Sequence, residues 1–130
     1  PASNNCLDMF REMFLVSALA KAREQDASCV SAEETLYMAT AGGARAMGLM
    51  DCDSLAEGKL ADLILIDLQQ PNMQPENHFV KNIVYSGSKQ NVLLTMVDGK
   101  ILYERQKFYI GTDPKEVYRL ANAIIGRMRE

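Results

Sequence analysis

The sequence has 130 residues, a length typical of one domain, and its 14 basic and 17 acidic side chains give a net charge of −3 at pH 7. With 48% hydrophobic and 24% charged residues, the composition is that of a globular protein and excludes the disordered and collagen-like classes. The chain holds 1 histidine, so one copy of it cannot complete a zinc centre that needs two or more imidazole ligands.

A long helix is predicted over Leu7 to about Gln25, because this segment lacks Gly and Pro and is rich in strong helix formers. Asn4 or Asn5 is the predicted N-cap, with Asp8 at the positive end of the helix dipole. Apolar side chains fall on almost every face of this segment, as they do in a helix that is covered on more than one side. We therefore expect it to lie between layers of a larger structure.

A second helix is predicted to begin at Ser31 and to run toward Met47. Its start is marked by the pattern S-A-E-E, in which Ser31 and Glu34 can form a capping box. Gly42 and Gly43 interrupt the helical pattern. Either the helix breaks there into two short pieces, or the glycines let another backbone approach closely.

Lys59–Asp67 is predicted to be a strand with both faces at least partly covered, because it contains the run L-I-L-I between Gly58 and a Gln-Gln-Pro segment. Asp62 and Asp67 have odd spacing along this strand, so they point to opposite faces and cannot share a site. We interpret each as ending or anchoring the strand. Asn82–Tyr85 is predicted to be a further short strand.

A β-hairpin is predicted over Val92–Val97 and Ile101–Glu104, joined at Asp98-Gly99. Both central residues of a type I′ turn need positive φ, which Asp-Gly tolerates well. The last predicted helix starts at Thr112-Asp113-Pro114 and is expected to bury one face. This face carries an apolar stripe at helical spacing: Val117, Leu120, Ala121, Ile124 and Met128. The predicted fold class is therefore α+β.

Ser3, Asn4 and Asn5 form the one cluster of short polar residues placed before a helix N-terminus, where they can cap the helix or face a ligand. His78 lies in a loop bordered by prolines and is interpreted as a surface residue, since no second imidazole and no carboxylate-rich motif supports a catalytic role. No catalytic residue and no metal ligand is assigned.

Cys6, Cys29 and Cys52 are odd in number and lack C-x-x-C spacing, which argues against both a disulfide framework and a thiolate metal site. A reducing cytoplasm fits this usage best. The longest strictly apolar runs, 13–16 and 63–66, are far shorter than a membrane span. Basic residues are scattered along the chain. No membrane or nucleic-acid partner is therefore predicted.

Five segments together resemble the C-terminal part of the metal-dependent amidohydrolase superfamily. They are P-A-S-N-N-C-L-D-M-F-R-E-M at 1–13, M-A-T-A-G-G-A-R-A-M-G-L at 38–49, E-G-K-L-A-D-L-I-L-I-D at 57–67, I-V-Y-S-G-S at 83–88 and M-V-D-G-K at 96–100. Within the superfamily, the chain is most similar to the branch of 5′-methylthioadenosine/S-adenosylhomocysteine deaminases and related chlorohydrolases.

The resemblance implies a (β/α)₈ barrel with a small β-sandwich, of which this chain holds only part, because a barrel alone needs about 250 residues. We expect a C-terminal fragment of a longer amidohydrolase, called the parent enzyme below. Residues 1–50 would be helices that follow the last barrel strand, 51–110 a β-sandwich portion, and 111–130 a C-terminal helix.

The resemblance also implies that the parent enzyme uses zinc or another divalent metal to hydrolyse a C–N bond of an aminopurine, with metal ligands upstream of this chain. Ser3, Asn4 and Asn5 would lie at the rim of the active site, where they position the metal-binding aspartate, cap the helix or touch substrate. No metal or other cofactor is expected in this chain alone, and the isolated chain is expected to be inactive.

Two classes of function stay open at this point. The parent enzyme is expected to deaminate an aminopurine such as 5′-methylthioadenosine or S-adenosylhomocysteine, with chlorohydrolase and guanine or cytosine deaminase activity as variants. Alternatively, the chain is a non-catalytic binding or assembly module. In either case the broad apolar surface of the first helix predicts self-association or association with the rest of the enzyme.

Overall fold

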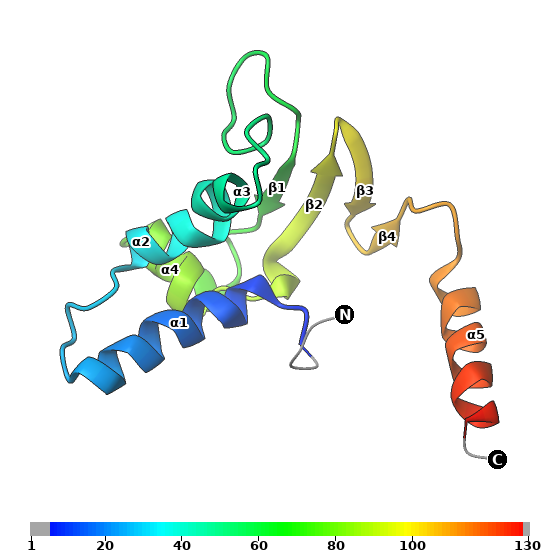
Figure 1. Ribbon diagram of the computed structural model, residues 1–130, viewed down its shortest axis with the longest axis horizontal. Coiled ribbons are helices and arrows are strands. Elements are labelled where there is room, and N and C mark those ends of the chain that lie inside the picture. The colour runs from blue at the N-terminus through cyan, green and yellow to red at the C-terminus, as the bar shows by residue number, and fades with distance from the viewer. Residues whose placement is uncertain (1–5, 129–130) are drawn as a thin grey trace.

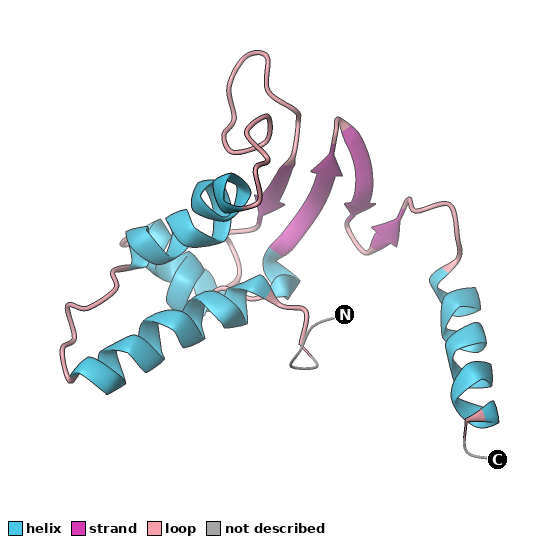
Figure 2. Ribbon diagram, in the orientation of Figure 1, coloured by secondary structure: helices cyan, strands magenta, loops and turns pink. Residues whose placement is uncertain are grey.

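The computed structural model of the protein describes residues 6–128 (Figure 1). The chain forms several helices and one small sheet (Figure 2). In order, the elements are α1 (Met9–Glu24), α2 (Ala32–Tyr37), the π-helix η1 (Met38–Gly42), α3 (Gly43–Ala46), β1 (Leu63–Ile66), the 3₁₀ turn η2 (Pro71–Met73), α4 (Phe79–Ser86), the 3₁₀ turn η3 (Lys89–Asn91), β2 (Val92–Val97), β3 (Lys100–Glu104), β4 (Lys107–Phe108) and α5 (Pro114–Arg127).

The helices α1 to α4 pack together beside the β1 end of the sheet, and α5 stands apart beyond β4 (Figure 1). The sheet is antiparallel throughout, in the order β1-β2-β3-β4. This arrangement agrees with the predicted α+β class. Every helix within residues 6–128 is too short or too polar to cross a bilayer.

Helix α1 begins two residues later than predicted. Asp8 is its N-cap and accepts hydrogen bonds from the backbone amides of Phe10 and Arg11, at 3.2 and 3.4 Å. The prediction of Asn4 or Asn5 as this cap is therefore wrong. A carboxylate placed directly before the first helical residues caps as well as an asparagine and also favours the positive end of the helix dipole.

The core lies where α1, α2 and α4 meet. Its buried members are Phe10, Met13, Ala32 and Val84. Only one side of α1 is covered within the described residues, while the other side is open to solvent. The open side carries large apolar residues, as the all-round apolar pattern predicts: Met9, Phe14, Val16 and Leu19, which are 57%, 45%, 44% and 64% exposed.

The capping box predicted for the second helix is confirmed, with Ser31 and Glu34 bonded in both directions. The helix does not break at the glycine pair but continues as α2, η1 and α3 through a π-helical stretch. A Cβ on Gly42 would lie 2.9 Å from Cε1 of Tyr37 and 3.0 Å from its carbonyl oxygen. Close approach by Tyr37 is therefore what the glycine permits here.

The strand predicted at Asn82–Tyr85 is wrong, because these residues belong to helix α4. His78 is the N-cap of α4, its Nδ1 accepting from the amide of Lys81 at 3.5 Å. Val80, Ile83 and Val84 then fall at helical spacing and face the core. A four-residue segment with three apolar residues fits either period, so the pattern alone does not distinguish strand from helix.

The strand predicted over Lys59–Asp67 is limited to its centre, β1. Its cover is incomplete, since Ile64 and Leu65, on opposite faces, are about half exposed. The two aspartates end the strand as predicted. Asp62 accepts a 2.7 Å hydrogen bond from the amide of Asp98 in the hairpin turn, and Asp67 accepts a 2.9 Å bond from the amide of Gln69.

The predicted hairpin is confirmed as β2 and β3. Asp98 and Gly99 both have positive φ, at 50° and 71°, as a type I′ turn requires. The start of the last helix is also confirmed, with Asp113 as the N-cap of α5 and Pro114 in its first turn. The expected burial of one face of α5 is wrong for the described residues, because its apolar stripe is open to solvent.

Gly87 fixes how closely α1 approaches the end of α4. A Cβ at this position would lie 2.8 Å from Cδ1 of Phe10 and closer still to the carbonyl oxygen of Ile83. Phe10 is itself buried. The aromatic ring therefore packs directly on the bare backbone of Gly87.

Replacing Gly87 with Ala is expected to destabilise the chain by about 1–3 kcal/mol, because the added methyl displaces Phe10 from a packed core. Chemical denaturation of the 130-residue chain measures this. Gly126→Ala in α5 is the matched control, since no atom lies within 4 Å of its Cβ position, and it is expected to be neutral or stabilising by up to about 1 kcal/mol. Equal stability of wild type and Gly87→Ala would contradict the packing argument.

Candidate functional site

The predicted site residues Ser3, Asn4 and Asn5 lie outside the described residues. The structure instead describes how α1, which follows them, is held in place. Two contacts between α1 and α4 do this, one near each end of α1. The first is the packing of Phe10 on Gly87, which fixes the start of the helix.

The second contact is a polar network around the hydroxyl of Tyr85. Lys21 donates to this hydroxyl at 2.7 Å, and Ser17 Oγ lies 3.2 Å from it. Ser17 is fully buried and donates to the carbonyl oxygen of Val30 at 3.0 Å. The ammonium of Lys21 and the hydroxyl of Ser17 lower the pKa of Tyr85. This network ties α1, the loop after it and α4 together.

A second charged cluster closes the loop between α3 and β1. The side chain of Asp53 is 4% exposed and pairs with Lys59 Nζ at 2.8 Å and Arg45 Nε at 2.9 Å. Lys59 also donates to the carbonyl oxygen of Met50. The hydrogen bonds from Lys59 and Arg45 hold the pKa of Asp53 far below its usual range. Arg45 belongs to α3 and Lys59 lies near the far end of the loop, so the cluster ties the two ends of the loop together and acts as a clamp.

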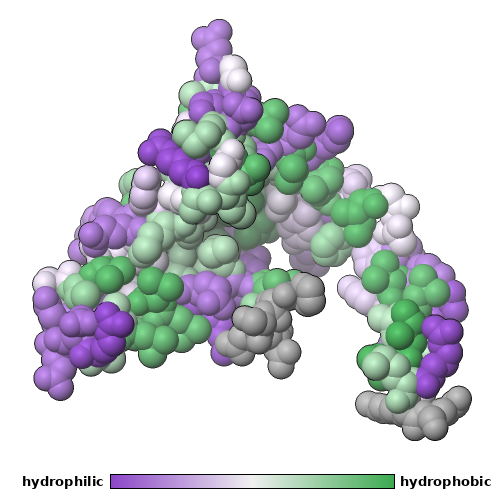
Figure 3. Space-filling model, in the orientation of Figure 1, coloured by the Kyte–Doolittle hydropathy of each residue, from purple (hydrophilic) through white to green (hydrophobic). Residues whose placement is uncertain are grey.

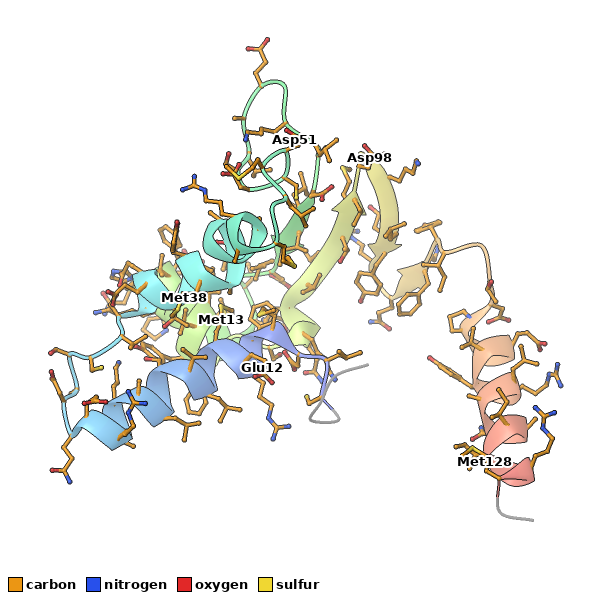
Figure 4. All side chains as sticks on the ribbon, in the orientation of Figure 1. Glu12, Met13, Met38, Asp51, Asp98 and Met128 are labelled. Atoms are coloured by element: carbon orange, nitrogen blue, oxygen red, sulfur yellow. The ribbon has the colours of Figure 1, made fainter. Side chains whose placement is uncertain are left out.

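A hollow of about 540 Å³ lies between this loop and strands β1 and β2. Asp51, within the loop, and Asp98, in the hairpin turn, lie at this end of the molecule (Figure 4). Burial, followed by the carboxylates of Asp62 and Asp53, raises the pKa of the Cys52 thiol that lines the hollow. Because the thiolate is the form that binds metal, this environment disfavours Cys52 as a metal ligand.

The described residues do not fit the metal that the sequence resemblance implies. Within residues 6–128, no three His, Cys, Asp or Glu side chains come together as a ligand set. His78 lies 3.4 Å from Glu33 and caps α4 through its other nitrogen, which agrees with its interpretation as a surface residue. One imidazole beside one carboxylate is too few ligands for a zinc centre.

Sequence reasoning missed both the Tyr85 network and the Asp53 clamp. The sequence pattern predicts a strand that ends at Tyr85, whereas Tyr85 belongs to α4, and its hydroxyl meets α1 only in the folded chain. Lys21 and Tyr85 are 64 residues apart and Arg45 and Asp53 are 8 apart. No local pattern links residues at such separations.

Comparison with known proteins places the chain in a family. A family model described as the amidohydrolase family matches residues 1–102. The chain belongs to the amidohydrolase family. The segments that resemble this family from residue 6 onward contact one another: Phe10 packs on Gly87, and Asp62 binds the turn of the hairpin. In the described residues these segments therefore serve the fold.

Two relatives illustrate the likeness in sequence. A 5-methylthioadenosine/S-adenosylhomocysteine deaminase of Dictyoglomus thermophilum is 41% identical over 118 residues, which are 91% of this chain and 28% of the relative. A 5′-deoxyadenosine deaminase of Methanosphaera stadtmanae is 38% identical over 117 residues, 90% of this chain and 27% of the relative. This amidohydrolase chain thus spans less than a third of the length of these relatives.

Solved structures share the fold. An adenosine deaminase from Xanthomonas campestris with bound zinc matches with a TM-score of 0.92 and 36% identity, over 98% of this chain and 29% of that one. An atrazine chlorohydrolase from Arthrobacter aurescens TC1, complexed with zinc, matches with a TM-score of 0.73 over 87% of this chain and 26% of that one. At 24% identity, the second likeness shows the fold alone.

Replacing Asp53 with Asn is expected to lower the melting temperature of the chain at neutral pH. The pKa of Asp53 is lowered in the folded state, so its contribution is fully present above the ordinary value of 3.8 and is lost as the pH falls through the folded-state pKa. Melting temperatures measured by circular dichroism from pH 7 downward should differ between wild type and variant by a constant amount down to about pH 4. Below about pH 4 the difference in melting temperature should narrow. Asp51→Asn, at an exposed neighbour, is the control and should melt like wild type. A difference that widens in acid would contradict the clamp.

Proposed function

We propose that this chain is the C-terminal part of an amidohydrolase that hydrolytically removes the amino group of an adenosine-type nucleoside, with 5′-methylthioadenosine or S-adenosylhomocysteine as the expected substrate. The observation that carries the proposal is the 41% identity over 91% of this chain to a protein named for deaminating these two compounds. The likeness to an adenosine deaminase over 98% of the chain supports it.

In this proposal the described residues support the fold around the active site and supply no group that takes part in the reaction. Because they form no ligand set, we propose that zinc or another divalent metal is held by side chains of the parent enzyme outside these 130 residues. The zinc bound to the adenosine deaminase, which is 36% identical to this chain, supports a metal in the parent enzyme. The chain alone is then inactive.

In this proposal Ser3, Asn4 and Asn5 lie at the rim of the active site, just ahead of the helix that the Phe10 contact fixes. Residues 1–50 belong to the barrel end, 51–110 to the sandwich and 111–130 to a terminal helix. The cytoplasm stays the expected compartment. Self-association through α1 stays a prediction, which the open apolar side of that helix supports.

Neither alternative activity is favoured by a specific observation. The likeness to a triazine chlorohydrolase, at 24% identity, concerns the fold. A guanine deaminase from E. coli matches with 25% identity and a TM-score of 0.63 over 75% of this chain, a weaker likeness than that to the adenosine deaminase. Adenosine-type substrates are therefore the first to test.

The experiment is an ammonia-release assay of the parent enzyme, loaded with zinc, on a substrate panel. We expect turnover of 5′-methylthioadenosine, S-adenosylhomocysteine or 5′-deoxyadenosine at least about tenfold above that of guanine and cytosine, a difference of about 1.4 kcal/mol in transition-state binding. A chlorinated triazine, assayed by chloride release, tests the alternative chlorohydrolase activity. Preference for guanine, cytosine or the triazine would contradict the proposal.

A further inference from the structure

A polar hollow lies where α1 ends and where α2 and α4 begin. Its volume is about 360 Å³, which is in the lower part of the range of about 300–1,000 Å³ found for small-molecule sites. Charged and hydroxyl side chains line it, among them Lys21, Glu33, Lys81 and Tyr85. The hollow therefore has the size and the polar lining of a site for a small, charged molecule.

This chain builds the hollow by itself, since all the lining residues come from α1, the loop after it, α2 and α4 with its N-cap. In the ribbon view α1 stops at the end of the helix pack that is farthest from α5 (Figure 1). Hydrophilic side chains gather at this end, whereas hydrophobic ones gather farther along α1 (Figure 3). The hollow thus differs from the apolar surfaces of the chain, which are typical of protein interfaces.

Two ammonium groups act on one hydroxyl group of the hollow. Lys21 Nζ donates to the hydroxyl of Tyr85 at 2.7 Å. Lys81 precedes Tyr85 by four residues on α4, so both side chains lie on the same face of that helix. The hydrogen bonds from Lys21 and Ser17, together with the charges of both lysines, lower the pKa of Tyr85. Both lysine charges therefore reach the same wall of the hollow.

Neither lysine is neutralised by a carboxylate of the described residues. Within residues 6–128, no ion pair includes Lys21 or Lys81. An ammonium group has more N–H donors than the single bond from Lys21 to Tyr85 uses. Like charges that act on one place repel each other, and an anion bound between them relieves that repulsion.

The acidic groups near the hollow are already engaged. Glu33 is the one carboxylate among the described lining residues, and its Oε1 lies 3.4 Å from His78 Nε2. Asp26 and Glu34 accept hydrogen bonds from nearby serine hydroxyls and do not line the hollow. The N-terminal end of α4 adds partial positive charge. The lining therefore carries a net positive charge.

We propose that this hollow binds a phosphate group between Lys21 and Lys81, either as inorganic phosphate or as part of a small phosphate monoester. A phosphate monoester carries a charge of about −1.5 to −2 at neutral pH, which matches two ammonium groups better than a single carboxylate does. Lysine binds phosphate as a point charge and needs no bidentate geometry. The proposal is independent of the deaminase activity.

The test is calorimetric titration of the parent enzyme with inorganic phosphate and with glycerol 3-phosphate, at neutral pH and fixed ionic strength. Lys81→Gln should weaken binding at least about fivefold, because a charge-assisted hydrogen bond is lost. It keeps the backbone amide of Lys81 that His78 caps. Lys115→Gln, which removes the same charge from an exposed residue of α5, is the matched control and should stay within about twofold of wild type.

A second pair of variants should act in the opposite direction. Glu33→Gln removes the carboxylate from the lining and should tighten phosphate binding at least about twofold. Glu57→Gln, at an exposed residue of the loop before β1, is its control and should bind like wild type. Circular dichroism verifies that each variant is folded.

Tighter binding of glycerol 3-phosphate than of inorganic phosphate would support the proposal with a monoester as the ligand, and equal binding would support it with free phosphate as the ligand. Glycerol alone should not bind. Absence of phosphate binding to wild type overturns the proposal. Equal binding by wild type and Lys81→Gln also overturns it, since phosphate held by a catalytic metal would give that result.

Discussion

Phe10 packs against the bare backbone at Gly87, and the rest of the helical layer is arranged around that contact. It sets the distance between α1 and α4 at the end where the chain enters. The Tyr85 hydroxyl, bonded to Lys21 and close to Ser17, fixes the other end of the same pair of helices. With α1 held at two points, the orientation of α1 relative to α4 is fixed.

Few of the apolar side chains that the chain carries are buried within the described residues. The buried apolar side chains of the described residues are Phe10, Met13, Ala32, Met73 and Val84. Large apolar residues on α1, β1 and α5 are about half exposed or more. Apolar surface left open on this scale marks an interaction surface. The described residues therefore behave as one part of a larger packed unit, which agrees with their match to less than a third of each relative.

Much of this fold could be predicted from local sequence. The capping box at Ser31, the Asp98-Gly99 turn and the proline start of α5 depend on neighbouring residues, and all were predicted correctly. The α4 helix was missed because a short apolar run fits two periods. The Asp53 clamp was missed because its partners approach only after the loop closes. The buried face expected for α5 is wrong for the described residues, where its apolar stripe is open to solvent, because helical spacing predicts that a face is apolar but not which element covers it.

The central claim is that this chain is a scaffold for a catalytic centre carried elsewhere in the parent enzyme. The most direct measurement is ammonia release from 5′-methylthioadenosine by the 130-residue chain, by the remainder of the parent enzyme, and by the two produced together, all with zinc present. The account predicts activity only when both parts are present. Release by the 130-residue chain alone, or full activity of the remainder without it, would contradict the account.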